Sequence, residues 1–329
     1  MKRITLKDIA KLANVSVTTV SLVLNDADSR ISSAKKEEIK NIAKELNYNP
    51  NYLAKSLSTG STKMVGLIIP DIENPYFSTF SKYIEDILRA KGYFVLLVNS
   101  NDKLDNDRKL INQLVDRRVD GLIIIPSIES YHKNNNQYIF KNINVPYVLV
   151  DRLFDEDAAN QVSYDNKYGG YIATKFLLEN GAINIACITG PLDSFSGKYR
   201  YQGYLKALSE NKLAVFKENI YEGDYRFETG YEYGLKLSKR NDIDGIFSCN
   251  DLMAYGVLKA FRELRVKPED FKIVGYDNLK QSEMFGISLT SVYQDINKLA
   301  EVSCKQLLAQ IKYPKYKKST VLRPKLIIK

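Results

Sequence analysis

The sequence has little of the chemistry on which enzymes and metal sites depend. Only one of its 329 residues is a histidine, His132, and it lies in a polar run that is typical of an exposed loop. Three scattered cysteines, Cys187, Cys249 and Cys304, have no metal-ligand spacing. Glycine-rich phosphate-binding motifs are absent as well. We therefore expect no catalytic residue, no metal site and no cofactor.

Long apolar runs are also missing. No stretch approaches the roughly 18 apolar residues of a membrane-spanning helix. The first residues form charged, amphipathic helices where a secretion signal would have to be. Two of the three cysteines lie in apolar, strand-like runs, which is typical of reduced cysteines in a protein core. These features predict a cytoplasmic protein that does not contact the membrane.

Positive charge is abundant. The chain has a net charge of +9, and its first 60 residues hold ten Lys and Arg against six Asp and Glu, a net charge of +4. A basic head of this kind is typical of nucleic-acid binding, although a solvated basic face would have the same composition. The length allows two or three domains with sizeable cores.

The first 25 residues have the pattern of two short helices joined by a tight turn. Thr5 is a favourable cap for a helix to about Leu12, and Ser16 for a second helix ending near Asn25. In a helix-turn-helix the second helix enters the DNA major groove. We expect a small core of Ile9, Leu12, Val15, Val20 and Leu24, with Val17, Thr18, Ser21 and Leu22 pointing outward to base edges. On this pattern alone, the alternative is an ordinary helical hairpin.

A third helix and a short linker follow. The pattern predicts a helix from Ile31 to Leu46, capped by Ser32, with Ile39, Ile42 and Leu46 on one face. Pro50 and Gly60 then bound a piece of only two helical turns, which is too short to be stable alone in water. That piece must fold against a partner.

From Ser61 onward, short apolar runs alternate with amphipathic helices. Seven runs are expected to be strands: 64–70, 93–99, 121–126, 147–151, 184–190, 245–250 and 271–277. Near-continuous apolar strands separated by helices indicate parallel sheets covered on both faces. Because a polar break at 160–163 divides the runs, we predict an α/β core of two doubly wound parallel-sheet lobes.

The end of the core has a less regular pattern. Residues 289–295 have the pattern of a crossing between lobes, 297–311 of a helix and 320–329 of a last edge strand. The expected domains are an all-α DNA-binding head at 1–49, a linker at 50–60 and a core at 61–329. We expect lobe one to comprise about 61–161 and 293–321, and lobe two 162–292 and 322–329.

The head and linker resemble the lac repressor family of transcriptional regulators (LacI/GalR). The opening motif T-x-x-D-[IV]-A-x-x-A-x-V-S-x-x-T-V-S-x-x-[LIV]-N is matched from Thr5 to Asn25. The linker motif L-N-Y-x-P-N-x-x-A-[RK]-x-L is matched from Leu46 to Leu57, with Lys55 where Arg is more usual. The resemblance implies a homodimer on double-stranded operator DNA, with a hinge helix whose Leu57 wedges into the minor groove. The DNA-binding residues it implies are Thr5, Ser16, Val17, Thr18, Thr19, Ser21, Leu22, Asn25, Ala54, Lys55 and Leu57.

The resemblance also implies a periplasmic-binding-protein-like core in which the chain crosses three times between lobes. Doubly wound sheets bind ligands at the carboxyl ends of their strands. Arg200 and Asp277 match the R-x-x-G-[FY] and G-[FY]-D motifs. The effector-binding residues implied are Tyr76, Phe77, Asp151, Ser196, Arg200, Tyr225, Asn250, Asp277 and Gln294. Carboxylates, amides, one arginine and flat aromatic side chains suit a small-molecule effector that is a sugar or a sugar phosphate.

Several of these residues have simpler explanations. Tyr76 and Phe77 also fit packing at the lobe interface, and Asp151, Asn250 and Asp251 also fit strand-end or helix-cap roles. A purine-binding member of the family has Arg where this chain has Ser194, which argues against a purine effector.

The sequence thus predicts a ligand-responsive repressor of carbohydrate-utilisation genes. One alternative is a solute-binding transport protein, which shares the core but needs a secretion signal; another is a catabolite-control regulator with a phosphocarrier protein partner. A two-lobed α/β transferase has no use for a helix-turn-helix. No leucine heptad of the kind that tetramerises the lac repressor follows Lys329, which favours a dimer.

Overall fold

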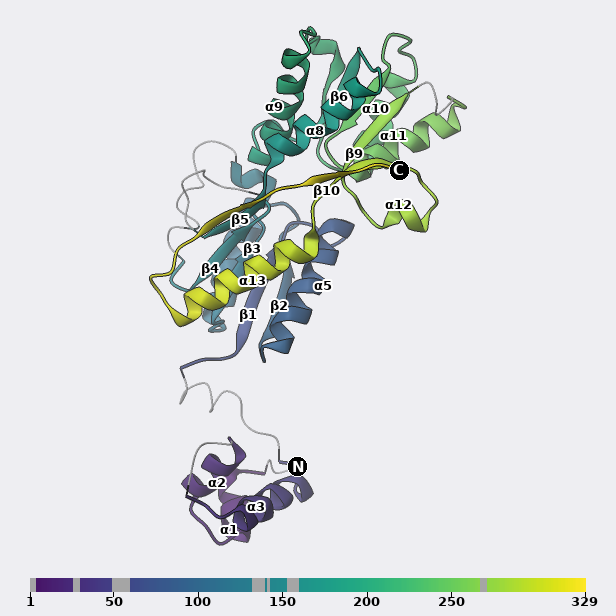
Figure 1. The fold of residues 1–329 in the computed structure, drawn as a ribbon. Helices are drawn as coiled ribbons and strands as arrows, with labels where there is room; N and C mark the ends of the chain where they lie inside the picture. The colour runs from purple at the N-terminus through teal and green to yellow at the C-terminus, as the bar shows by residue number, and fades with distance from the viewer. Residues whose placement is uncertain are drawn as a thin grey trace. The chain divides into compact units, whose positions relative to one another are not determined.

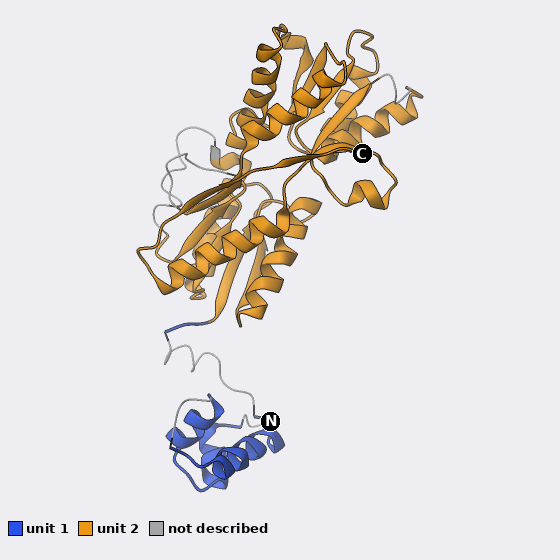
Figure 2. Cartoon of the chain, viewed as in Figure 1, with its two compact units in different colours: residues 1–62 blue, residues 63–329 orange. Residues whose placement is uncertain are grey.

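The computed structural model describes residues 4–25, 30–48, 60–131, 140, 143–152, 160–266 and 271–329. They belong to two compact units, residues 1–62 and 63–329 (Figure 2). His132 and the hinge residues Ala54, Lys55 and Leu57 lie outside the described residues. Within the described ranges, no helix combines the length and apolar character needed to cross a membrane.

The first unit contains helices α1 (Leu6–Leu12), α2 (Val17–Leu24) and α3 (Ser33–Glu45), as the sequence predicts. The backbone N–H and the hydroxyl of Thr5 donate to the Asp8 carboxylate at 2.8 and 2.7 Å, which fixes the start of α1. The Ser16 hydroxyl accepts from the Thr19 N–H at 3.0 Å and caps α2. Asn14, in the turn, has a φ of 51°, a conformation that asparagine tolerates.

The core of this unit differs from the expectation at one residue. Ile9 and Val20 are fully buried, but Leu12 is 61% exposed. On α1 the buried side chains are those of Ile9, Ala10 and Ala13, and Leu12 lies on the flank of that face. Val23 of α2 is buried in its place.

The second unit is built on two six-stranded sheets (Figure 1). The first sheet has the order β11-β5-β4-β3-β1-β2 and consists of β1 (Met64–Ile69), β2 (Phe94–Asn99), β3 (Gly121–Ile124), β4 (Tyr147–Val150), β5 (Gln161–Tyr164) and β11 (Ser319–Leu322). The second has the order β12-β10-β9-β8-β6-β7 and consists of β6 (Ile185–Thr189), β7 (Ile220–Glu222), β8 (Gly245–Ser248), β9 (Lys272–Asp277), β10 (Thr290–Tyr293) and β12 (Lys325–Ile327). All pairs are parallel except β10 with β12. Two doubly wound lobes are therefore confirmed.

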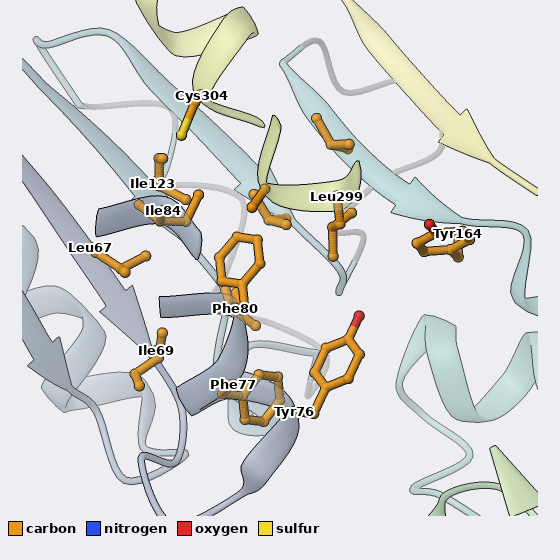
Figure 3. Packing of buried hydrophobic residues seen from close by; sticks show 14 of the residues in the cluster. Leu67, Ile69, Tyr76, Phe77, Phe80, Ile84, Ile123, Tyr164, Leu299 and Cys304 are labelled. Carbon is orange, nitrogen blue, oxygen red and sulfur yellow. The ribbon is translucent and has the colours of Figure 1, made fainter. Parts of the chain in front are cut away.

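Helices cover both sheets. Those connected to the first sheet are α5 (Pro75–Ala90), α6 (Leu104–Asp116), η1 (Ile128–Tyr131) and α13 (Ile296–Lys312). Those of the second are α8 (Asn166–Glu179), α9 (Phe195–Glu210), η2 (Lys217–Asn219), α10 (Phe227–Leu237), α11 (Asp251–Glu263) and α12 (Gln281–Met284). Alternate residues of β1 point to opposite faces: Leu67 packs with α5 and α13 (Figure 3), and Ile68 packs in the cluster that contains α6.

Three details of the crossings correct the sequence expectations. The supposed polar break at 160–163 is largely β5, whose four residues are buried in the first sheet, so the expected boundary at 161/162 falls inside a strand. The segment 289–295 contains β10, a strand of the second sheet, and the chain crosses only after it. The tail is not one edge strand, because β11 pairs with β5 in the first sheet and β12 with β10 in the second.

Candidate functional site

The second helix of the head presents a set of exposed side chains. Val17 is 39% exposed and Leu22 is 37% exposed. Thr18 is exposed between them, and Ser21 is half-buried on the same helix. This face has the mixture of methyl and hydroxyl groups that can contact base edges in the major groove.

The other described DNA-binding candidates lie at the helix ends. Ser16 and Thr19 form the α2 cap, and their hydroxyl oxygens lie 2.9 Å apart. The Asn25 amide donates to the Ser21 carbonyl oxygen at 2.8 Å. The Thr5 hydroxyl is bonded to Asp8. These residues therefore have structural roles whether or not they also contact DNA.

The nine effector candidates surround one cavity between the two lobes. About 330 Å³ of empty space lies among their side chains, part of it open to solvent. Lobe one contributes side chains from the start of α5 and the end of β4. Lobe two contributes side chains from α9, the loop after β7, the start of α11 and the end of β9. Gln294 follows β10, where the chain crosses between the lobes. The cavity residues are Asn74, Tyr76, Phe77, Asp151, Arg152, Ser196, Arg200, Tyr225, Asn250, Asp277 and Gln294.

Arg200 is held rigidly although it is buried. Its Nε donates to Asn166 Oδ1 at 2.8 Å, and its Nη1 donates to the Cys249 carbonyl oxygen at 2.6 Å. The guanidinium carbon lies 3.7 Å from the centroid of the Tyr276 ring. A fixed, planar guanidinium facing a small cavity is well suited to bind hydroxyl, carboxylate or phosphate oxygens.

Two carboxylates face the same space. Asp151 Oδ1 accepts from the Tyr76 hydroxyl at 2.9 Å, and Asp277 Oδ1 accepts from Gln294 Nε2 at 3.0 Å. Burial raises the pKa of Asp277 well above its usual range, against the opposing effect of Arg200. Gln294 Oε1 is buried and has no hydrogen-bond partner among the described residues. Because Gln294 also lines the cavity, this acceptor is a candidate contact for a ligand that donates a hydrogen bond.

The backbone at the cavity is unusual. Asp151, Tyr225 and Asp277 have φ values of 66°, 68° and 105°, a region that costs non-glycine residues on the order of 1–3 kcal/mol each. Gly190 makes room for one of these side chains, because a Cβ there would lie 2.0 Å from the Tyr225 ring. Strained residues that converge on one cavity are typical of a ligand-binding site.

Two cavity residues were missed by the sequence reasoning. Asn74 precedes Tyr76 and Phe77 and caps α5, because its Oδ1 accepts from the Tyr76 N–H at 3.0 Å. Arg152 directly follows Asp151 at the end of β4, and this position was the available signal. It forms a buried ion pair with Asp102, donates to the Pro126 carbonyl oxygen at 3.1 Å and lies 5.2 Å from the Phe77 ring.

The simpler explanations apply to several of these positions. Tyr76 and Phe77 are buried in a hydrophobic cluster (Figure 3). Both residues also line the cavity. Asn250 caps α11 through the Met253 N–H at 2.9 Å, yet it too lines the cavity. Ser194 caps α9 by accepting from the Gly197 N–H at 3.1 Å and does not line the cavity.

The described residues contain no cluster that could hold a metal ion, and Cys187, Cys249 and Cys304 are buried and free. A helix-turn-helix unit joined to a two-lobed core with a polar interlobe cavity defines the class of ligand-responsive DNA-binding regulators. Comparison with known families specifies the class further. A model of the lacI family of bacterial regulatory proteins matches residues 5–51, and a model of the periplasmic binding protein domain matches residues 65–315.

The chain belongs to the lacI family of bacterial regulatory proteins. It is 33% identical over 330 residues to the HTH-type transcriptional repressor PurR of Mannheimia succiniciproducens, a match that covers 99% of this chain and 97% of the relative. The lac repressor dimer bound to operator and the anti-inducer ONPF superposes with a TM-score of 0.87 at 26% identity, covering 100% of this chain and 98% of that one. The transcriptional regulator CelR in complex with cellobiose superposes with a TM-score of 0.73 at 28% identity, covering 99% of each chain.

Proposed function

We propose that this protein is a cytoplasmic repressor that binds a palindromic operator as a homodimer and responds to a sugar or sugar phosphate in the interlobe cavity. The observation that carries the proposal is the convergence of nine predicted side chains, drawn from both lobes and the crossing, on one cavity. Two heads are needed because one helix-turn-helix makes too few base contacts for high specificity. We also propose that the protein has no enzymatic activity.

The cavity favours a polyol over a flat heterocycle. Asp151, Asp277 and Gln294 supply acceptors for vicinal hydroxyl groups, and Arg200 supplies donors. The similarity to PurR makes a purine the competing ligand class, although Ser194 is a helix cap where a purine-binding member has Arg.

Asp277→Asn tests the assignment of the cavity. We expect the wild-type melting temperature to rise with one class among monosaccharides, sugar phosphates and purine bases, because a ligand of the native state stabilises it by mass action. The variant should lose that rise and the effector-dependent change in operator affinity, while its basal operator affinity stays unchanged. Asp105→Asn, an exposed carboxylate of α6, is the matched control. A variant that keeps the wild-type ligand profile would show that the site lies elsewhere.

The second candidate function is catabolite control, in which a phosphocarrier protein binds the repressor together with the sugar or instead of it. It predicts that operator affinity responds to a phosphorylated carrier protein even in the Asp277→Asn variant, and the same assay separates the two.

A further inference from the structure

The first residues of the strands of lobe one and the last residues of helix α13 lie at one end of the lobe. The registers of β1 with β2 and of β3 with β4 place Met64 beside Phe94, and Leu122 beside Tyr147. Helix α13 ends at Lys312, and the loop that follows it reaches the same end, where the Lys318 N–H donates to Asn160 Oδ1 at 3.4 Å. We call this end the base of lobe one.

The base of lobe one is strongly basic. Its exposed basic residues are Lys63, Lys91, Arg117, Arg118, Lys312, Lys315, Lys317 and Lys318. The described acidic residues there are Asp116 and Asp120, so eight positive charges stand against two negative charges, a net charge of +6. Residues 61–329 as a whole hold 38 Lys and Arg against 33 Asp and Glu, a net charge of +5. The excess positive charge of the core is therefore concentrated at this end.

The corresponding end of lobe two has no such excess. There Arg240 forms an ion pair with Asp242, and Asp244 accepts from the Ile183 N–H at 2.9 Å. Counted in the same way, from the last residues of the helices to the starts of the strands, six described basic residues stand against six described acidic residues. The basic residues are Lys212, Lys217, Lys239, Arg240, Arg265 and Lys272, and the acidic residues are Glu179, Glu210, Glu218, Asp242, Asp244 and Glu263. The two lobes share one topology, so the fold itself does not require a basic base on lobe one.

Chain connectivity limits how far this surface can lie from the head. Lys63 is both part of the base and the first residue of the second unit. Residues 49–62 lead to it from the head, and even a fully extended chain of that length spans no more than about 50 Å. A connection of this length allows the base to approach duplex held by the head, and a duplex carries one phosphate charge per roughly 1.7 Å of its axis.

We propose that the base of lobe one is a second, sequence-independent DNA contact that neutralises backbone phosphates around the site read by the head. The inference rests on the proposed function, because it needs a head that binds DNA. The head then selects the sequence, and the base adds affinity and salt dependence to any duplex.

The test compares two full-length variants that each remove four positive charges. The base variant carries Lys91→Gln, Arg117→Gln, Lys315→Gln and Lys317→Gln. The control variant carries Lys212→Gln, Lys217→Gln, Lys236→Gln and Lys239→Gln, all on lobe two. Fluorescence anisotropy measures binding to a duplex selected by the wild-type chain and to a scrambled duplex, at salt concentrations between about 50 and 200 mM.

We expect the base variant to bind both duplexes at least about fivefold more weakly at low salt, with a slope of log K against log salt shallower by about 0.9 for each phosphate that the base no longer neutralises. The control variant should match the wild type, and the sequence preference of all three should be the same. Equally weakened binding in both variants would show a general effect of net charge. Unchanged binding in the base variant would show that this surface does not contact DNA. Either result overturns the proposal. A wild-type chain that selects no sequence would instead overturn the proposed function.

Discussion

Asp251 is the buried carboxyl group with the clearest consequence for stability. It is the first residue of α11, it is fully buried, and it accepts from the Leu279 N–H and the Ser291 hydroxyl, each at 2.7 Å. These hydrogen bonds favour the charged form, but burial dominates and raises the pKa of Asp251 to about 7. Between the unfolded value near 3.8 and this folded value, the native state binds the extra proton.

The raised pKa of Asp251 means that the free energy of unfolding decreases as the pH rises. The contribution of Asp251 is full below about pH 4 and is lost as the pH rises through 7, an effect of up to about 4 kcal/mol. Asp251→Asn cannot lose a proton, so its free energy of unfolding should improve relative to wild type between about pH 5 and pH 8. Urea denaturation at both values measures the difference, with Asp105→Asn as an exposed control. Parallel pH profiles for wild type and Asp251→Asn would contradict the assignment.

Individual residues also show where sequence reasoning stops. Arg200 and Asp277 could be named because they lie in sequence motifs, and the other seven predicted cavity residues because the family resemblance implied them. Arg152 follows Asp151 in the sequence, but its position at the cavity depends on Asp102, which lies 50 residues earlier in the chain and which no local pattern connects to it. Asp251 shows the opposite case: it is a polar residue at a strand end, yet its side chain turns into the sheet.

At the level of elements, the local signals were sufficient for the head. Caps, turn and helix bounds came from Thr5, Ser16 and Asn14, whose effects act within a few residues. The core lobes needed more. Strand β5 contains Gln161 and Ser163, which resemble a loop in sequence and become buried only because β4 and β11 flank them. Tertiary pairing of this kind cannot be derived from a local pattern.

Helix α2 should set the operator preference. Val17, Thr18 and Leu22 form its exposed face, so exchanging them for other side chains should change the preferred half-site bases, at about 1–3 kcal/mol for each mismatched pair. Binding-site selection with the variant chains measures this preference. Lys7→Ala, in the neighbouring helix α1, is the control and should only weaken binding and reduce its salt dependence. An unchanged preference in the α2 variants would mean that another element reads the bases.

The linker supports a separate prediction, which depends on the sequence because Leu57 lies outside the described residues. Insertion of Leu57 into the minor groove would partly unstack the duplex and bend it. Leu57→Ala should therefore reduce operator affinity and DNA bending and leave binding to a scrambled duplex unchanged. Anisotropy on both duplexes, together with a bend assay, measures these effects. Equally weakened binding to both duplexes would make Leu57 an ordinary linker residue.

For the whole molecule, the central question is how a ligand in the cavity affects DNA binding. The cavity draws side chains from both lobes and from the crossing after β10, so a bound effector interacts differently with different lobe arrangements. A ligand shifts an equilibrium only by its difference in affinity for the two states. Asp151 from lobe one and Asp277 from lobe two face the same space, and a ligand bridging them would favour the arrangement in which both reach it.

Thermodynamic linkage makes this mechanism measurable. If the effector changes operator affinity through the lobe arrangement, the coupling should lie at about 1–3 kcal/mol, and the operator must change effector affinity by the same factor. Titrating effector into the free protein and into the operator complex, and operator into the protein with and without effector, gives the four constants of this cycle. The Asp277→Asn variant should reduce the coupling to zero while its operator affinity equals that of the effector-free wild type. A coupling that persists in this variant would place the communicating ligand outside the interlobe cavity.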